Sequence, residues 1–146
     1  MLAQSCLLIC LASTLSLVGL IWFVQRVHYP LLSRVGPGSF GPYHAEHVRR
    51  IGPVVAPLMV AELLSSLALV PLRPPGVPVE LALTGLTLAG ATWLSTALVQ
   101  VPLHRRLSAR FDSAVHAALI RTNWFRTAAW TGHGLVVLAM VARAIL

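Results

Sequence analysis

The sequence predicts an all-α membrane protein built as a bundle of four transmembrane helices. The chain of 146 residues is 57% hydrophobic and 10% charged, with a mean hydropathy of +0.80, so its polar residues are too few to cover a water-soluble domain. Four apolar runs are each long enough for the roughly 20 residues that a helix needs to cross a bilayer. Nine of the eleven arginines are confined to two stretches, 25–51 and 104–126.

The first half of the chain contains two of the expected spans. The first covers about 2–24 and is followed by a loop rich in glycine and proline, 36–42. A short amphipathic cytoplasmic helix, 43–50, then precedes the second span at about 51–72. Two prolines near the start of the second span predict a kink or a tight first turn there.

The second half repeats this plan. Three prolines and a glycine within 74–78 predict a short turn, and the third span follows at about 79–103. A polar helical segment, 104–121, leads to the fourth span at about 124–146. We expect residues 1–146 to form one integral membrane domain.

The distribution of arginine predicts the orientation in the membrane. Positively charged short loops stay in the cytoplasm, so both arginine stretches should face inward and both termini outward, in a multi-pass protein of the cell's inner membrane. The net charge is +7, but the arginines flank apolar spans and do not form one basic face. We therefore expect membrane lipids as partners, through their anionic headgroups, and no nucleic acid.

The chain also aligns with itself at an offset of 71 residues. This offset places Trp22 on Trp93, Arg34 on Arg105 and Glu62 on His133. The match favours a duplicated helical hairpin with parallel topology, its halves related by a pseudo-two-fold axis along the membrane normal. It predicts that Glu62 and His133 lie at similar depth on equivalent helices.

Glu62 is the clearest candidate for a functional residue within a span. An ionisable group in the hydrocarbon layer costs about 2.5–3.5 kcal/mol, so it normally faces the bundle interior and has a partner. Ser65 and Ser66 share its helix face, and His133 is the candidate partner across the bundle. Glu62 is either a carboxylate that carries protons or binds a ligand, or a polar clamp between two helices.

Histidines gather at the expected cytoplasmic ends of the spans. His44 and His47 are spaced to share one helix face, an arrangement common for two metal ligands, and His28 and His104 follow the first and third spans. We take His44, His47 and His104 as candidate metal ligands, with a transition metal as the candidate cofactor. The alternative is that these histidines are solvated or bind lipid headgroups.

Polar residues also extend from the interface into the third and fourth spans. Thr92, Thr96, Gln100 and His104 recur every four residues; such a stripe either lines a hydrated route into the membrane or bonds to its own backbone. Arg126, near the start of the fourth span, can extend to the headgroups or pair with Glu62 or Asp112.

Several familiar catalytic signatures are missing from the sequence. It contains no phosphate-binding glycine loop, no nucleophile elbow and no HExxH motif. Hydrolases and nucleotide-driven enzymes are therefore disfavoured.

Six sequence segments resemble a family of small bacterial four-helix membrane proteins without assigned function, and the resemblance covers most of the chain. They are His28-Tyr29-Pro30, FGPYHAEH at 40–47, Arg50-Ile51, the stretch from Pro57 to Glu62, Gln100-Val101-Pro102 with His104, and Asn123-Trp124-Phe125-Arg126-Thr127. Size and layout are also distantly similar to the anthrone-oxygenase-like membrane proteins, which oxidise aromatic polyketides. The resemblance implies functional positions at His44, His47, Glu62, His104, Asn123 and Arg126, with Glu62, His104, Asn123 and Arg126 as the catalytic candidates.

Three functions remain open from the sequence. The favoured one is a membrane-embedded oxidoreductase or oxygenase acting on a lipophilic small molecule, in which the histidines hold a metal or act as acid–base groups. The second is a proton-coupled transporter or channel component that uses Glu62, for which four spans also require a homo-oligomer. The third is a non-catalytic membrane subunit whose polar residues serve helix packing.

Overall fold

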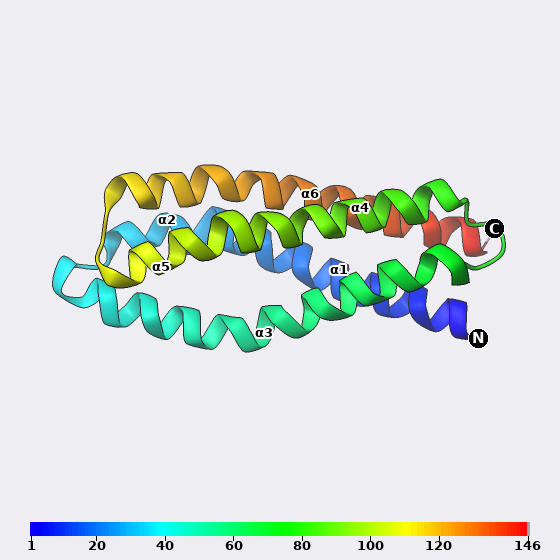
Figure 1. The fold of residues 1–146 in the computed structure, drawn as a ribbon, viewed down its shortest axis with the longest axis horizontal. Helices are drawn as coiled ribbons and strands as arrows, with labels where there is room; N and C mark the ends of the chain where they lie inside the picture. The colour runs from blue at the N-terminus through cyan, green and yellow to red at the C-terminus, as the bar shows by residue number, and fades with distance from the viewer. Residues whose placement is uncertain (146) are drawn as a thin grey trace.

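Four long helices form the bundle in the computed structural model, which describes residues 1–145 apart from the side chain of Pro37 (Figure 1). The elements are α1 (Leu2–Phe23), η1 (Val24–His28), α2 (Tyr29–Leu31), η2 (Leu32–Arg34), α3 (Pro37–Leu72), α4 (Val79–Ser95), η3 (Thr96–Gln100), α5 (Val101–Ala109) and α6 (Ser113–Ile145). The elements from α1 to η2 are continuous, as are those from α4 to α5. The all-α, four-helix prediction is therefore confirmed.

Each of the four helices is long and apolar enough to cross a membrane, which fits an integral membrane protein. With 31 to 35 residues, each is roughly 50 Å long, whereas the hydrocarbon layer is about 30 Å thick. The expected spans lie inside these helices as far as residue 145. The helices must therefore extend beyond the hydrocarbon layer.

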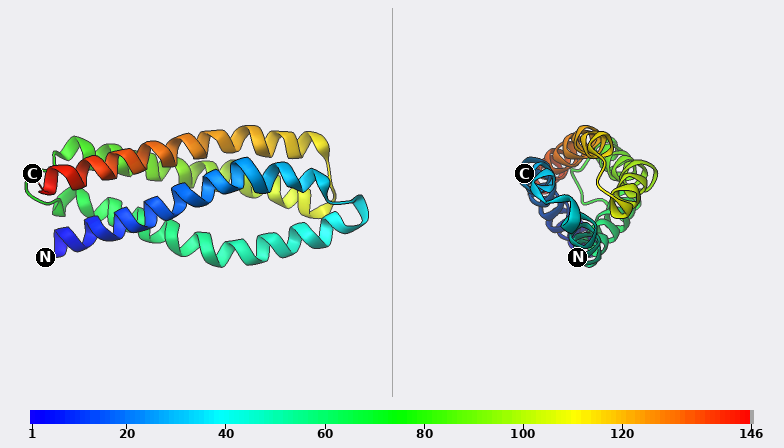
Figure 2. Two further views of the ribbon diagram at one scale, coloured as in Figure 1. Left: turned by 180° about the vertical axis from the view of Figure 1, so that it is seen from behind. Right: turned by 90° about the vertical axis from the view of Figure 1, so that its left-hand side faces the viewer.

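The helices pack in a closed ring, seen end-on in Figure 2. The first helix (α1) packs against α3 and α6, and α4 packs against the same two helices. Both termini and the turn at 73–78 lie at one end of the bundle, and the connections at 35–36 and 110–112 lie at the other (Figure 1). We call the latter the arginine-rich end, because both arginine stretches meet there.

The two hairpins share an unusual backbone feature, at an offset of 72 residues, one more than the offset at which the sequence aligns with itself. The π-helical segments η1 and η3 carry hydrogen bonds from Tyr29 N–H to the Val24 carbonyl and from Val101 N–H to the Thr96 carbonyl. A proline comes two positions after the end of each π-helical segment, Pro30 after η1 and Pro102 after η3. Proline lacks an N–H and clashes with the carbonyl four residues earlier, and the wider π turn makes room for it.

One local prediction is wrong: residues 36–50 are not a loop followed by a separate amphipathic helix. Residues 37–50 are the first part of α3, which continues without a break for 36 residues and has four prolines in its interior besides the one at its start. The prolines bend the helix rather than end it, and in Figure 1 α3 bows away from α5. The polar segment at 104–121 is interrupted instead, because Arg110 adopts an extended conformation (φ −165°, ψ 156°).

The last helix begins after this break with a side-chain cap. Asp112 Oδ1 accepts hydrogen bonds from the backbone N–H groups of Val115 (3.0 Å) and Ala114 (2.9 Å). These bonds, with the nearby Arg106 and Arg110, hold the pKa of the Asp112 carboxyl below its usual value. The cap satisfies N–H groups that a helix start leaves unpaired.

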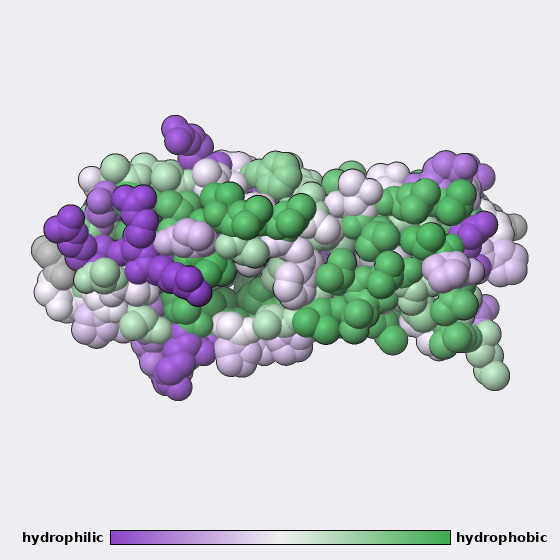
Figure 3. Space-filling view, viewed as in Figure 1, coloured by the Kyte–Doolittle hydropathy of each residue, from purple (hydrophilic) through white to green (hydrophobic). Residues whose placement is uncertain are grey.

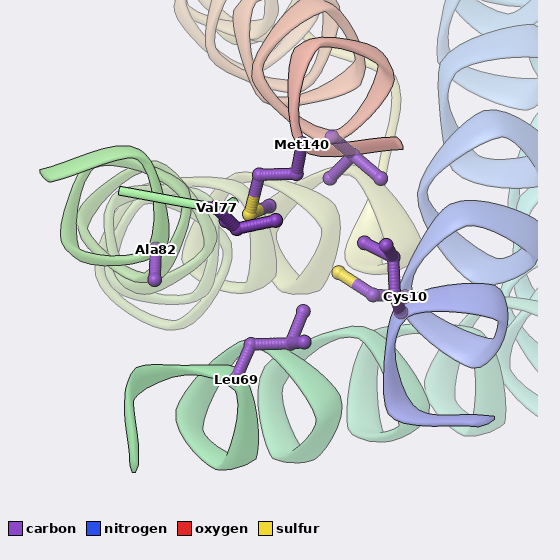
Figure 4. Packing of buried hydrophobic residues seen from close by; sticks show 7 residues of the cluster. Cys10, Leu69, Val77, Ala82 and Met140 are labelled. Carbon is purple, nitrogen blue, oxygen red and sulfur yellow. The ribbon is translucent and has the colours of Figure 1, made fainter. Parts of the chain in front are cut away.

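The end of the bundle that carries the termini is closely packed. Figure 4 shows part of its core, formed by residues from several elements: Cys10, Leu69, Val77, Ala82 and Met140. The turn before α4 also packs tightly, because a Cβ added to Gly76 would lie 2.6 Å from the Arg143 carbonyl oxygen. Gly76 has φ +85°, a conformation that glycine adopts at little cost.

Candidate functional site

The bowed middle of α3 borders a cavity of about 550 Å³ in the arginine-rich half of the bundle. The view of this face in Figure 3 shows a hollow bordered by hydrophobic residues between α3 and the helix formed by α4 and α5. Apolar side chains from α1, η1, α3, α4, α5 and α6 line most of it: Leu17, Leu20, Ile21, Val24, Val48, Ile51, Val55, Ala56, Met59, Trp93, Val101 and Trp130. In a bilayer, such an opening on the side of a bundle faces lipid.

A chain of hydrogen bonds crosses the polar end of the cavity. The Tyr29 hydroxyl lies 2.8 Å from His104 Nε2, and His104 Nδ1 lies 3.0 Å from His44 Nε2. The other nitrogen of His44, Nδ1, lies 2.9 Å from the Ser108 hydroxyl. Tyr29, His104 and Ser108 all line the cavity. Each of these side chains can both donate and accept a hydrogen bond, so a proton can pass along the chain.

His47 also lines the cavity, but its ring is held differently. It stacks on His28 with ring centroids 4.1 Å apart. Among the hydrogen bonds of the described residues, none involves the ring nitrogens of His47, whereas both nitrogens of His44 and His104 are engaged. His47 is therefore the imidazole with nitrogens available to a molecule in the cavity.

The three candidate metal ligands come together, yet not in the arrangement that a metal needs. The His44 ring centroid lies 5.2 Å from that of His104, and both lie 6.2 Å from that of His47. The facing nitrogens of His44 and His104 bond to each other. Within residues 1–145, no group of three His, Cys, Asp or Glu side chains is placed to hold a metal ion. The metal site therefore stays a prediction.

The polar stripe of the third helix reaches the cavity through three of its four members. Thr96, Gln100 and His104 line it, whereas Thr92 is fully buried. The Thr92 hydroxyl donates to the Ala89 carbonyl, and the Thr96 hydroxyl donates to the Thr92 carbonyl. The backbone-bonding role expected from the sequence is therefore present at Thr92 and Thr96, and the hydrated route stays a prediction.

Arg126 neither extends to the headgroups nor pairs with Glu62 or Asp112. It is only 6% exposed, and no ion pair involving it occurs among the described residues. Its Nη1 donates to Asn123 Oδ1 at 2.9 Å, and its guanidinium lies 4.7 Å from the centre of the Trp130 ring. Asn123 in turn donates to Gln25 Oε1 at 2.7 Å. Asn123 thus holds Arg126 at the cavity wall.

Glu62 lies apart from the cavity, in a fully buried polar cluster. Its Oε1 lies 2.9 Å from His133 Nδ1, and its Oε2 accepts a hydrogen bond from Trp130 Nε1 at 3.0 Å. Ser66 Oγ approaches both His133 Nε2 and Cys10 Sγ at 3.5 Å. Neither Glu62 nor His133 lines the cavity, so of the four catalytic candidates only His104 and Arg126 do.

Two residues of the site were not singled out by the sequence. Tyr29 appears there only within the His28-Tyr29-Pro30 segment, although a buried tyrosine hydroxyl requires a partner and this side chain is only 3% exposed. Gln25 follows the predicted first span directly and has no role in the sequence-based predictions. The available signal for Gln25 was an amide side chain next to the apolar residues of the first span, because a buried amide must also be hydrogen-bonded.

No protein-family model, curated protein or solved structure matches this chain. The function is therefore inferred from the geometry of the cavity and the residues around it. That geometry offers an apolar volume beside acid–base side chains and a buried guanidinium.

Proposed function

We propose that this integral membrane protein is an enzyme of oxidoreductase or oxygenase type that acts on a lipophilic substrate taken from the surrounding lipid. The observation that carries the proposal is the joining of a lateral apolar cavity to His47, His104 and Tyr29 at one end. A volume of about 550 Å³ falls within the range of about 300–1,000 Å³ typical of small-molecule sites. The arginine-rich end faces the cytoplasm in this proposal.

The histidines supply proton transfer in this proposal. The free ring nitrogens of His47 make it the base that accepts a proton from a substrate hydroxyl or activated C–H group. The Tyr29 hydroxyl, fixed by its 2.8 Å bond to His104, donates a hydrogen bond to the oxygen on which negative charge develops. The His104–His44–Ser108 chain holds the tyrosine in place and can return a proton to it.

Deprotonation prepares an electron-rich aromatic substrate for oxidation. When a lipophilic hydroquinone loses two protons and passes two electrons to dioxygen, the products are the quinone and hydrogen peroxide. Dioxygen dissolves well in lipid and reaches the same cavity. The residues then provide binding, orientation and proton transfer, and the electrons pass from the substrate to dioxygen.

The Glu62–His133 pair is better explained as a polar clamp than as a transport site. All of the carboxylate's direct partners are buried protein groups, His133 and Trp130. A carrier must expose its ion site to one side and then the other, whereas both side chains of this pair are 0% exposed.

Oxygen uptake by the reconstituted protein tests the proposal. The protein in lipid nanodiscs is supplied with lipophilic hydroquinones and hydroxylated anthrones in air, and oxygen consumption and the product spectrum are recorded. We expect turnover above protein-free nanodiscs and a loss of about 100-fold or more in kcat for His47→Asn, the range for removal of an acid–base group. Gly90→Ala, at an open position on α4, serves as the control and should keep full turnover.

The outcomes separate the candidate functions. No turnover with any of these substrates overturns the oxidase proposal. Turnover that His47→Asn leaves unchanged overturns the assignment of the base. Proton flux across proteoliposomes that Glu62→Gln abolishes would instead establish the transporter.

A further inference from the structure

Arg126 is a buried cation without a counter-charge in the described part of the chain. The sequence has four acidic residues, and within the described residues two of them form ion pairs. Glu46 pairs with Arg49 and Arg50, and Glu62 pairs with His133. Arg126 forms no ion pair, and its Nε has no hydrogen-bond partner. A buried charge left unpaired is strongly unfavourable, so its retention beside a cavity requires an explanation.

The surroundings of Arg126 hold its guanidinium in one position. Gln25 orients Asn123, and Asn123 accepts the hydrogen bond from Nη1. Trp130 covers one side of the guanidinium at 4.7 Å. Both Arg126 and Trp130 line the cavity, so the charge is fixed at the boundary of a volume that a ligand can fill. Such preorganisation reduces the cost of binding.

A second buried polar atom without a partner belongs to another residue of the cavity lining. Gln100 donates to the Thr122 hydroxyl through Nε2 at 3.0 Å, while its Oε1 is buried with no partner. Gln100 lines the cavity together with Arg126. A buried acceptor without a donor is costly, and a ligand hydroxyl directed at Gln100 would remove that cost.

We propose that the cavity binds a lipophilic oxyanion, a carboxylate or phenolate whose charged oxygen lies against Arg126 and whose apolar body lies between α1, α3 and α4. A hydroxyl next to the oxyanion bonds to Gln100. Guanidinium groups favour such oxygens because they offer parallel donors in a plane. The inference rests on the proposed function, since it names the charge class of the substrate for the same cavity. A neutral lipid would leave Arg126 unpaired.

Contact quenching of tryptophan fluorescence tests this inference without requiring turnover. Trp93 and Trp130 line the cavity, and bromine quenches indole on contact. A brominated fatty acid is added to the protein in nanodiscs, and the saturable part of the quenching is defined by competition with the unbrominated acid. We expect saturable quenching by the acid, and binding at least about tenfold weaker for its neutral methyl ester, as expected when a charged hydrogen bond is lost.

Two arginine variants on the same helix provide the matched comparison. Arg126→Gln removes the buried charge, and Arg121→Gln removes an equal charge from an exposed position of α6. Only Arg126→Gln should weaken binding of the acid about tenfold or more, while leaving the ester unchanged. Arg126→Lys, which keeps a point charge but loses the planar geometry, should give an intermediate affinity.

Equal affinity for the acid and its ester, or equal losses in Arg126→Gln and Arg121→Gln, would overturn the oxyanion assignment. The proposed enzyme function fails separately. Turnover of neutral hydroquinones together with equal binding of acid and ester would leave the oxidase standing and remove the oxyanion. Selective binding of the acid without turnover would keep the oxyanion assignment and overturn the oxidase.

Discussion

Glu62 and His133 are separated by 71 positions in the chain and lie 2.9 Å apart across the bundle. The sequence aligns with itself at the same offset, so this bond joins two positions that the predicted duplication makes equivalent. Equivalent residues can contact each other only near the axis that relates them. The contact agrees with the pseudo-two-fold axis that the sequence repeat favours, and both side chains are 0% exposed, as expected of ionisable groups within apolar helices.

The first prediction concerns the stability provided by this pair. In His133→Leu, Glu62 keeps only Trp130 as a partner, and we expect a loss of about 3–5 kcal/mol in the free energy of unfolding. The double variant Glu62→Leu, His133→Leu should be less destabilised than the sum of the single variants, because it leaves no isolated charge. Denaturant titration in detergent micelles measures all three. Strictly additive losses would contradict the clamp.

A glycine beside His133 provides an independent test of the same contact. A Cβ at Gly85 would lie 3.3 Å from His133 Nε2, whereas a Cβ at Gly90 meets nothing within 4 Å. Gly85→Ala should displace the histidine ring and destabilise the protein by about 1 kcal/mol. Gly90→Ala should stabilise it by about 0.5–1 kcal/mol through helix propensity. Thermal unfolding of the two variants measures both effects. Effects of the same sign would show that the His133 ring adjusts freely.

The turn between α3 and α4 should not tolerate a side chain at Gly76. Its φ of +85° costs an L-residue about 1–2 kcal/mol, and an added Cβ would lie 2.6 Å from the Arg143 carbonyl oxygen. We expect Gly76→Ala to lower the melting temperature clearly. Gly36→Ala, with φ −60° and open space around it, should change it little. Equal melting temperatures for the Gly76→Ala and Gly36→Ala variants would show that the turn does not pack against the end of α6.

The cap of α6 should make stability depend on pH. The N–H donors of Val115 and Ala114 lower the pKa of Asp112 in the folded state, so the cap contributes fully above the unfolded pKa, near pH 4. It is lost as pH falls through the lower folded pKa. Asp112→Ala should therefore be less stable than the wild type at neutral pH, and the difference should shrink in acid. A difference that grows in acid would contradict the cap.

The sequence was sufficient to predict the four-helix fold, because the four apolar runs and the confinement of arginine leave little choice of architecture. It also identified Glu62 and His133, since an ionisable residue within an apolar run needs a partner. The cavity was not predictable in the same way. It depends on how far the prolines of α3 bend that helix, and on the meeting of Tyr29, His104 and Arg126 from three separate helices. Residue spacing and composition do not predict these distances between side chains of different helices.

Photolabelling with benzophenone tests most directly whether lipophilic molecules enter the cavity from the lipid. Benzophenone is itself lipophilic, and on illumination it reacts preferentially with methionine side chains. Met59 lines the cavity, whereas Met140 belongs to the closed core near the termini, and both are almost fully buried. After illumination in nanodiscs, mass spectrometry should find the label on Met59 and not on Met140. Labelling of Met59 no greater than that of Met140 would contradict the account.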